Sequence, residues 1–355
     1  MMHLRWPRRL AALALSIALL AACGTQAPSA APTAAPEPPA DGGAAPSQEL
    51  VTLRTGYIPQ NIIFAPLYVA MERGYFAEEG IAIELTPIQS GNEAVVQLAA
   101  GNFDVSLGGA GAGLFNAAER GVRFTIVAPL HSERKPVSSP LVISPKRAGE
   151  LTSIADLRGK KVAVNARGAG TEYWLAQALA QGGLTMDDVE FVPMPFPNMP
   201  AALENGSLDA AILTEPLTTI SMDKGLVTVL ADNFIDGFTA TYVYMGDALL
   251  TGQPEAARGF MRAYLRGARD LQGDYMTDEV AAIIEKYTEV PADVLKRIYA
   301  PQYNPNGSVP VEDLATLQEY FRDRGLLEYQ ELLDVSSFVN TELAAEVAAE
   351  LDAEK

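Results

Sequence analysis

The side chains that could do chemistry in this 355-residue chain are few in kind. Beyond residue 23 the sequence has a single histidine, His131, and no cysteine. Disulfides, thiol nucleophiles and zinc–thiolate sites are therefore excluded from that part, and a Ser-His-Asp triad would have to use His131. Carboxylates and lysines would remain for an enzyme. We expect no catalytic residue, metal or cofactor, and a hinge or surface position for His131.

Two short polar segments are typical of helix starts that bind anions. Thr171 follows a Gly-Ala-Gly run, and Ser90 and Asn92 flank a glycine in a similar setting. Free backbone N–H groups at a helix N-terminus favour a negative ligand, and glycines let it approach the backbone. Arg167 could add a bidentate contact to a carboxylate, sulfonate or phosphate, but a solvated surface arginine would give the same sequence.

A second set of candidate residues would suit a flat ring instead. Stacked aromatic side chains, with a few polar groups at the ring edge, bind planar heterocycles. The aromatic candidates are Tyr57, Phe64, Tyr173, Trp174 and Tyr242, and the polar candidates are Asn61, Asn198 and Glu215. Adjacent Tyr173 and Trp174 cannot share one helix face, so part of this set must lie in the core. A carboxylate at Glu215 would repel anions and favour a cationic ligand or one that carries N–H groups.

An internal repeat indicates which elements position these residues. Residues 98–107 resemble residues 203–212, and each copy is typical of a helix end, a glycine turn and a buried strand. The surrounding strands and helices recur in the same order, which favours a doubly wound, mainly parallel sheet in each copy. Two such units predict an α/β fold of two lobes with a cleft between them, and ligands bind beyond the carboxyl ends of the strands.

A glycine-rich run at residues 108–113 ends one of the predicted strands and contains Gly109 and Ala110. Its spacing resembles a dinucleotide fingerprint only because glycine is dense there, and the flanking context of that motif is missing. The run therefore predicts close approach of the backbone to a ligand, or a hinge.

The N-terminus has the pattern of an export signal. Three arginines precede the apolar run 10–20, which is too short to span a bilayer. The run ends in Leu-Ala-Ala-Cys-Gly, which resembles a bacterial lipobox and implies cleavage after residue 22 and a diacylglycerol on the sulfur of Cys23. Residues 23–49 are rich in Ala, Pro and Gly, so we expect a disordered tether. The predicted location is the extracytoplasmic face of a membrane.

Charge and length limit the remaining possibilities. Loss of residues 1–22 would remove three of 26 basic residues and none of 44 acidic ones, which leaves 23 against 44, or −21. Such a charge argues against nucleic acid or anionic lipid as a partner. The remaining chain can form two compact domains. We expect lobe 1 to comprise residues 50–137 and 240–335, lobe 2 residues 138–239, and residues 336–355 to form an acidic helix or tail with a solvated face.

The sequence also resembles a known family. The string from 56 to 76 and its continuation from 79 to 85 resemble the type II periplasmic solute-binding proteins of the alkanesulfonate, taurine, nitrate and thiamin-pyrimidine-precursor group. Residues 155–164 and the pair Glu215-Pro216 fit the same family. The resemblance implies a Venus-flytrap fold that closes on a small molecule and hands it to the permease and ATPase of an ABC importer. We expect a monomer.

The sequence leaves the ligand open. A planar or aromatic nutrient, such as a vitamin, a pyrimidine precursor or a flavin, is the leading hypothesis. A small oxyanion such as a sulfonate, taurine or nitrate is the alternative. A carboxylate-based enzyme and a sensor lipoprotein without a transporter are less favoured. The family's pyrimidine-synthesising branch uses histidine and cysteine residues, and this chain is nearly without them.

Overall fold

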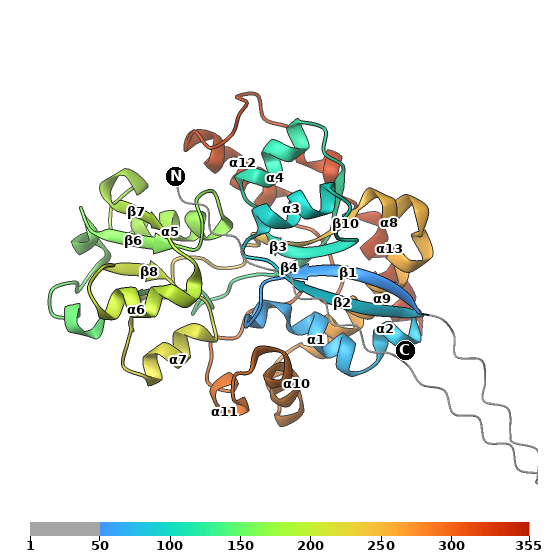
Figure 1. The fold of residues 1–355 in the computed structure, drawn as a ribbon, viewed down its shortest axis with the longest axis horizontal. Coiled ribbons are helices and arrows are strands. Elements are labelled where there is room, and N and C mark those ends of the chain that lie inside the picture. Colours follow the sequence, from blue (N-terminus) through green and yellow to red (C-terminus); the bar gives the residue numbers. More distant parts are fainter. Residues whose placement is uncertain (1–49, 355) are drawn as a thin grey trace, which may run out of the picture. The chain divides into compact units, whose positions relative to one another are not determined.

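The computed structural model describes residues 50–354, which lie within one compact unit, Gln48–Lys355 (Figure 1). The predicted signal peptide, Cys23 and tether lie outside the described residues. Within the described part, no helix has both the length and the apolar character needed to cross a membrane.

The first sheet has five strands in the order β2-β1-β3-β10-β4. Strand β1 pairs in parallel with β2 and β3, whereas β10 is antiparallel to β3 and β4. The strands are β1 (Val51–Tyr57), β2 (Ile81–Pro87), β3 (Val105–Gly109), β4 (Phe124–His131) and β10 (Thr241–Gly246). The connecting helices are α1 (Ala65–Glu72), α2 (Tyr75–Glu78), α3 (Gly91–Ala99) and α4 (Ala112–Glu119).

The second sheet repeats this arrangement in the order β7-β6-β8-β5-β9. Strand β6 is parallel to β7 and β8, and β5 is antiparallel to β8 and β9. The strands are β5 (Leu141–Ile143), β6 (Lys161–Val164), β7 (Glu190–Pro193), β8 (Ala210–Ile212) and β9 (Thr228–Ala231), and the helices are α5 (Gly170–Gln181), α6 (Met199–Glu204) and α7 (Leu217–Asp223). The predicted two-lobed α/β fold is confirmed, because the repeated sequence segments form α3–β3 in one lobe and α6–β8 in the other.

Helices after β10 cover the first sheet and reach the second lobe. They are α8 (Asp247–Gly252), α9 (Pro254–Asp270), α10 (Asp278–Thr288), α11 (Ala292–Leu295), α12 (Val311–Asp323) and α13 (Glu342–Ala353). Helix α9 packs closely on α1, since a Cβ at Gly267 would lie 2.2 Å from the carbonyl oxygen of Pro66. Helix α12 contacts both α4 of the first lobe and α5 of the second.

The acidic C-terminal segment differs from the solvated face that the sequence led us to expect. Helix α13 packs against α9, and its apolar side is buried in the core of the first lobe. The residues buried there are Ala344, Val347, Ala348 and Leu351. Its acidic side forms ion pairs with α9, among them Arg258 with Glu346 at 2.8 Å and Arg262 with Glu350 at 3.1 Å. Burial of small apolar residues therefore decides where this helix lies. The sequence gives little sign of that burial, because the helix is only weakly amphipathic.

A pair of identical substitutions tests this docking. Val347 is 0% exposed and Val96, on α3, is 65% exposed. Val347→Ala should lower the free energy of unfolding by about 2 kcal/mol, because it removes two buried methyl groups and leaves a void. Val96→Ala should have almost no effect, or stabilise α3 slightly, because alanine is the better helix former. Urea denaturation of both variants measures the difference, and equal small effects would contradict the packing of α13.

Candidate functional site

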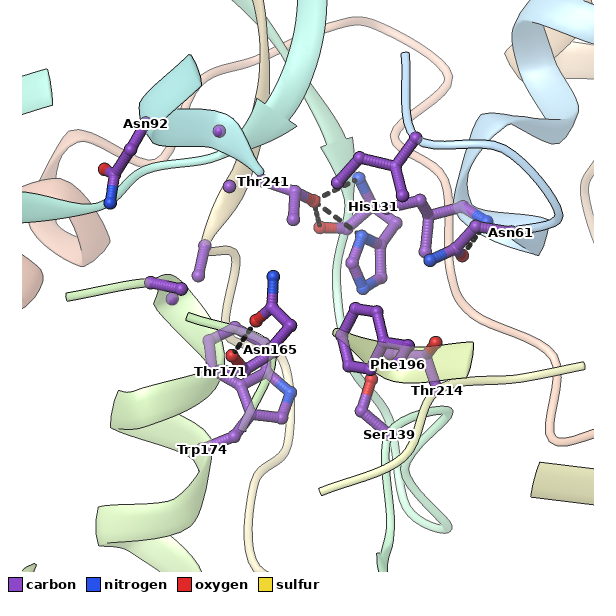
Figure 2. A pocket seen from close by; sticks show the side chains of 17 residues that line it. Asn61, Asn92, His131, Ser139, Asn165, Thr171, Trp174, Phe196, Thr214 and Thr241 are labelled. Atoms are coloured by element: carbon purple, nitrogen blue, oxygen red, sulfur yellow. Dashed lines mark hydrogen bonds between the residues drawn. The ribbon is translucent and has the colours of Figure 1, made fainter. Parts of the chain in front are cut away.

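A small cavity of about 60 Å³ lies where the two lobes face each other (Figure 2). It is lined by loops and helix starts that follow strands of both sheets, as expected for open α/β sheets. The first lobe contributes Ile58, Asn61, Ile63, Gly91, Asn92, Gly109, His131 and Thr241; the second contributes Asn165, Ala169, Gly170, Thr171, Trp174, Phe196 and Thr214; the segments between the sheets contribute Ser139 and Ala240.

His131 is the last residue of β4, and Figure 2 shows its ring between Asn61 and Asn165. Its Nδ1 lies 2.6 Å from the hydroxyl oxygen of Thr241, and its Nε2 lies 3.7 Å from a carboxylate oxygen of Glu133. Although the side chain is only 4% exposed, Nε2 has no hydrogen-bond partner. We had expected a hinge or surface position for this residue. It does end the strand from which the chain leaves the first sheet, but its ring lines the cavity.

Glu133 carries a buried charge directly behind this ring. One carboxylate oxygen accepts a hydrogen bond from the backbone N–H of Ser138 at 2.6 Å, and the other accepts from the indole N–H of Trp174 at 3.0 Å. Burial raises the pKa of this carboxyl, but the contacts with His131, Trp174 and Ser139 outweigh it, so the pKa lies below its usual value. The carboxylate is therefore ionised at neutral pH. Its charge favours the His131 tautomer with the proton on Nε2, in which the Thr241 hydroxyl donates to Nδ1.

Neutral amide groups complete the polar lining. The side-chain oxygen of Asn61 accepts from the N–H of Ile63 at 3.1 Å and so caps the 3₁₀ turn before α1. The side-chain oxygen of Asn165 accepts from the Thr171 hydroxyl at 2.5 Å. Each asparagine keeps its NH₂ group as a donor. Together with His131 they place hydrogen-bond donors around a space that also touches the rings of Trp174 and Phe196.

Five of the residues predicted from the sequence line this cavity, namely Asn61, Asn92, Gly109, Thr171 and Trp174. Asn92 acts structurally as well, because its side-chain oxygen accepts from the N–H of Gly113 at 3.1 Å and fixes the start of α4.

The other predicted aromatic residues lie in the core. Phe64 and Tyr242 are fully buried, and the Tyr242 hydroxyl donates to the carbonyl of Thr239 at 2.9 Å. Tyr57 is half-buried and packs edge-on against Phe64. Tyr173 does not line the cavity, and its ring packs on Phe238 and on Tyr320 of α12. The prediction that these rings line the cavity differs from the structure, because helix and strand periodicity turns them to the other face.

The remaining predicted residues also lie outside the cavity. Ala110 is buried, and its N–H donates to the carbonyl of Ala240 at 2.7 Å. Ser90 precedes α3 without capping it, and Asn198 is exposed at the start of α6. Arg167 is exposed, with its guanidinium 4.8 Å from the centre of the Phe191 ring. Glu215 is 2% exposed and accepts hydrogen bonds from Thr219 rather than facing the cavity.

Several residues that line the cavity were not predicted from the sequence, for one shared reason. Asn165, Phe196 and Thr214 fall on the predicted strand-end loops, but nothing local distinguishes them from their neighbours. Glu133 carried a usable signal, since it is an acid that closely follows the long apolar strand β4. A charge at that place is either exposed or bound by several donors.

A larger pocket of about 300 Å³ adjoins the cavity. The two share Ile58, Asn61, Phe196 and Thr214 in their linings. We call this space the adjoining pocket; its other lining residues are Pro59, Gln60, Ile88, Gln89, Pro195, Pro197, Pro216, Leu217, Ile220, Thr288, Glu289 and Val290.

Comparison with known proteins agrees with this architecture. The riboflavin-binding protein RibY of Chloroflexus aurantiacus is 32% identical over 265 residues, which cover 72% of each chain. The 4-amino-5-hydroxymethyl-2-methylpyrimidine phosphate synthase of Aspergillus parasiticus is 25% identical over 240 residues, 64% of this chain and 66% of that protein. The alkanesulfonate-binding protein SsuA of Xanthomonas axonopodis, solved bound to MOPS, superimposes with a TM-score of 0.67 at 20% identity and covers 84% of this chain and 99% of that chain.

At such identity the SsuA structure is evidence for the fold alone. A family profile described as NMT1/THI5 like matches residues 61–274, which is more than half of the chain. With the RibY similarity and the two-lobed structure, this match confirms the resemblance seen in the sequence: the chain belongs to the NMT1/THI5-like family.

Proposed function

We propose that this protein is the extracytoplasmic solute-binding subunit of an ABC importer and that it captures a small planar heteroaromatic nutrient. A vitamin or a pyrimidine precursor fits this description, and riboflavin is the first candidate because RibY carries that name. One observation carries the proposal: the described residues that line the cavity combine aromatic rings with neutral donors and include no lysine or arginine.

The ring would be held by its faces and its polar edge. Trp174 and Phe196 offer apolar surface for the ring. The Nε2–H of His131 and the NH₂ groups of Asn61 and Asn165 donate to the ring nitrogens and carbonyl oxygens that a heteroaromatic nutrient carries. Because Nε2 is buried without a partner, the ligand's acceptor atom would satisfy it.

The oxyanion alternative is less well supported. Helix starts at Gly91 and Gly170 do line the cavity, and such starts favour anions. Each already has an acid of the protein in its first turn, however. Glu93 accepts from the N–H of Gln89 at 2.8 Å, and buried Glu172 accepts from the N–H of Gly168 at 2.7 Å. With ionised Glu133 close by, a sulfonate or nitrate would meet negative charge with no cation to offset it.

Ligand binding provides the main test. In the mature chain, proposed to begin at Cys23, Trp174 is the one tryptophan, so its fluorescence reports the cavity directly. Riboflavin should quench it saturably. His131→Ala and Asn165→Ala should each weaken binding about 10- to 100-fold, because each leaves a ligand acceptor unpaired.

Arg167→Ala is the matched control for this experiment. It should leave riboflavin binding unchanged, since Arg167 is exposed and outside the cavity. If taurine or nitrate binds tightly and Arg167→Ala abolishes that binding, the proposal of a heteroaromatic ligand is contradicted. Mass analysis of the released ligand distinguishes binding from the chemical conversion that the similarity to a synthase suggests.

Glu215 gives the protein a distinct pH response. Burial raises its pKa to about 7 from 4.5, against the hydrogen bonds that it accepts from Thr219. Between these values the folded state keeps a proton that the unfolded state has lost, so stability should fall as pH rises from 4.5 to 7. The loss is on the order of 3 kcal/mol. Glu215→Gln should remove this decline, as denaturation at several pH values would reveal. Glu319→Gln, at an exposed site on α12, controls for net charge, and an unchanged slope in Glu215→Gln would contradict the assignment.

The proposed anchor at Cys23 would keep the protein near its permease. A lipid anchor confines the subunit to the membrane surface and so raises its effective concentration there. Cys23→Ser should move the protein from the membrane fraction to the soluble extracytoplasmic fraction of a bacterial host, whereas Ser29→Ala should leave it on the membrane. Retention of the Cys23→Ser protein on the membrane would refute lipid attachment at this residue.

A further inference from the structure

The cavity is too small to hold a vitamin-sized ligand by itself. Its volume of about 60 Å³ corresponds to about five water molecules. The adjoining pocket offers about 300 Å³ and shares four lining residues with the cavity. A ligand whose ring edge reaches His131 must therefore extend past Asn61 and Phe196 into the adjoining pocket.

The adjoining pocket has a distinct chemical character. Its walls combine prolines and aliphatic side chains with the neutral polar groups of Gln60, Gln89 and Thr288. Among the described residues that line it, Glu289 is the one charged side chain, and none is basic. Arg297, whose charge acts on Glu215, is held by both carboxylate oxygens of Asp223, at 3.0 and 2.6 Å.

Backbone donors near the adjoining pocket are also in use. The N–H of Gln89, which could meet a ligand there, donates to Glu93 at 2.8 Å. At the start of α7, the N–H of Thr219 donates to Glu215 at 3.1 Å. A negatively charged ligand group would thus find neither a side-chain cation nor a free helix start, although these are the groups that bind phosphate.

We infer that the adjoining pocket is a second subsite, which holds the uncharged substituent of a two-part ligand and excludes its phosphorylated form. This inference rests on the proposed function and makes it more specific. A phosphate ester carries a charge of about −1.5 to −2 at neutral pH. If the phosphate group entered this pocket, it would lose its hydration without gaining a cation as a partner. It would also lie near the carboxylate of Glu289. A hydroxylated or apolar chain meets no such penalty and can bond to the glutamine amides.

Backbone conformation at the adjoining pocket supports a functional role. Gln60 and Glu289 are the non-glycine residues with positive φ among the described residues, at 55° and 59°, and both line this pocket. Such conformations are unfavourable for residues with a Cβ and concentrate at ligand-binding sites.

The experiment compares ligands that differ only by a phosphate. Trp174 fluorescence of the mature chain measures the affinity of riboflavin against riboflavin 5′-phosphate. It also compares 4-amino-5-hydroxymethyl-2-methylpyrimidine with its phosphate. In the pair that binds, the phosphorylated ligand should bind at least about 10-fold more weakly than its neutral partner. This difference in affinity should decrease as salt is raised, because salt screens the repulsion by exposed Glu289.

Charge reversal then tests the location. Glu289→Lys should improve the affinity for the phosphorylated ligand several-fold relative to the affinity for its neutral partner. Glu319→Lys makes the same change in net charge at an exposed position on α12, outside the pocket, and should alter neither affinity.

The outcomes separate this inference from the proposed function. If a phosphorylated ligand binds as tightly as its neutral partner, the subsite is wrong and the proposed function stands. If Glu289→Lys and Glu319→Lys behave alike, the substituent does not lie in the adjoining pocket. If no member of either pair binds, both the proposed function and this inference are contradicted.

Discussion

The buried carboxylate of Glu133 ties together the parts of the chain that meet at the cleft. The chain passes between the sheets twice, after β4 and before β10, and Glu133 bonds to both segments. Its carboxylate accepts from Ser138 in the first, while its backbone N–H donates to the carbonyl of Phe238 in the second, at 3.1 Å, and its own carbonyl accepts from Gly237 at 2.8 Å. The indole of Trp174 adds α5 to the same residue. An ionised group with 0% exposure is tolerated only because such donors surround it, and its loss would leave the Ser138 amide and the Trp174 indole without their acceptor.

A second set of contacts closes the lobes on each other away from this charge. The N–H of Ala112, at the start of α4, donates to the carbonyl of Gly168 at 2.8 Å. The approach requires glycine, since a Cβ at Gly111 would lie 2.4 Å from that carbonyl oxygen. Helix α12 spans the lobes as well, and Arg324 just beyond it lies 3.5 Å from Glu172 and 2.9 Å from Asp187. The cleft is therefore bounded by backbone contacts on one side and by the crossing segments on the other, which leaves the small cavity between them.

The sequence was informative where the signal is local and uninformative where it depends on packing. Strand, glycine turn and helix alternate within a few residues, so the repeat predicted both α/β lobes and the strand-end loops that carry Asn61, Asn92 and Thr171. Which face of an element meets the cavity is set by sheet twist and helix rotation, and local patterns do not encode these. Tyr242 and Phe64 therefore turned out to be core residues, while His131 turned out to line the cavity. The docking of helix α13 on α9 was not predicted for a related reason, because alanines bury well but give little amphipathic contrast.

The proposed preference of the cleft for neutral ligands is consistent with where acids of the protein lie at its helix starts. A helix N-terminus needs an acceptor for its free N–H groups, and a bound anion can be that acceptor. Here Glu93 and Glu172 accept from the N–H groups of Gln89 and Gly168, which lie just before α3 and α5, and Glu215 accepts from Thr219 in the first turn of α7. These carboxylates place negative charge beside the helix starts, and the side-chain donors that line the cavity belong to neutral groups such as the Asn61 and Asn165 amides. A ligand then gains by bringing acceptors without net charge, as a heteroaromatic ring does. Under the proposed function, the position of these acids at the helix starts, with the sheets unchanged, would then select for ligands without net charge.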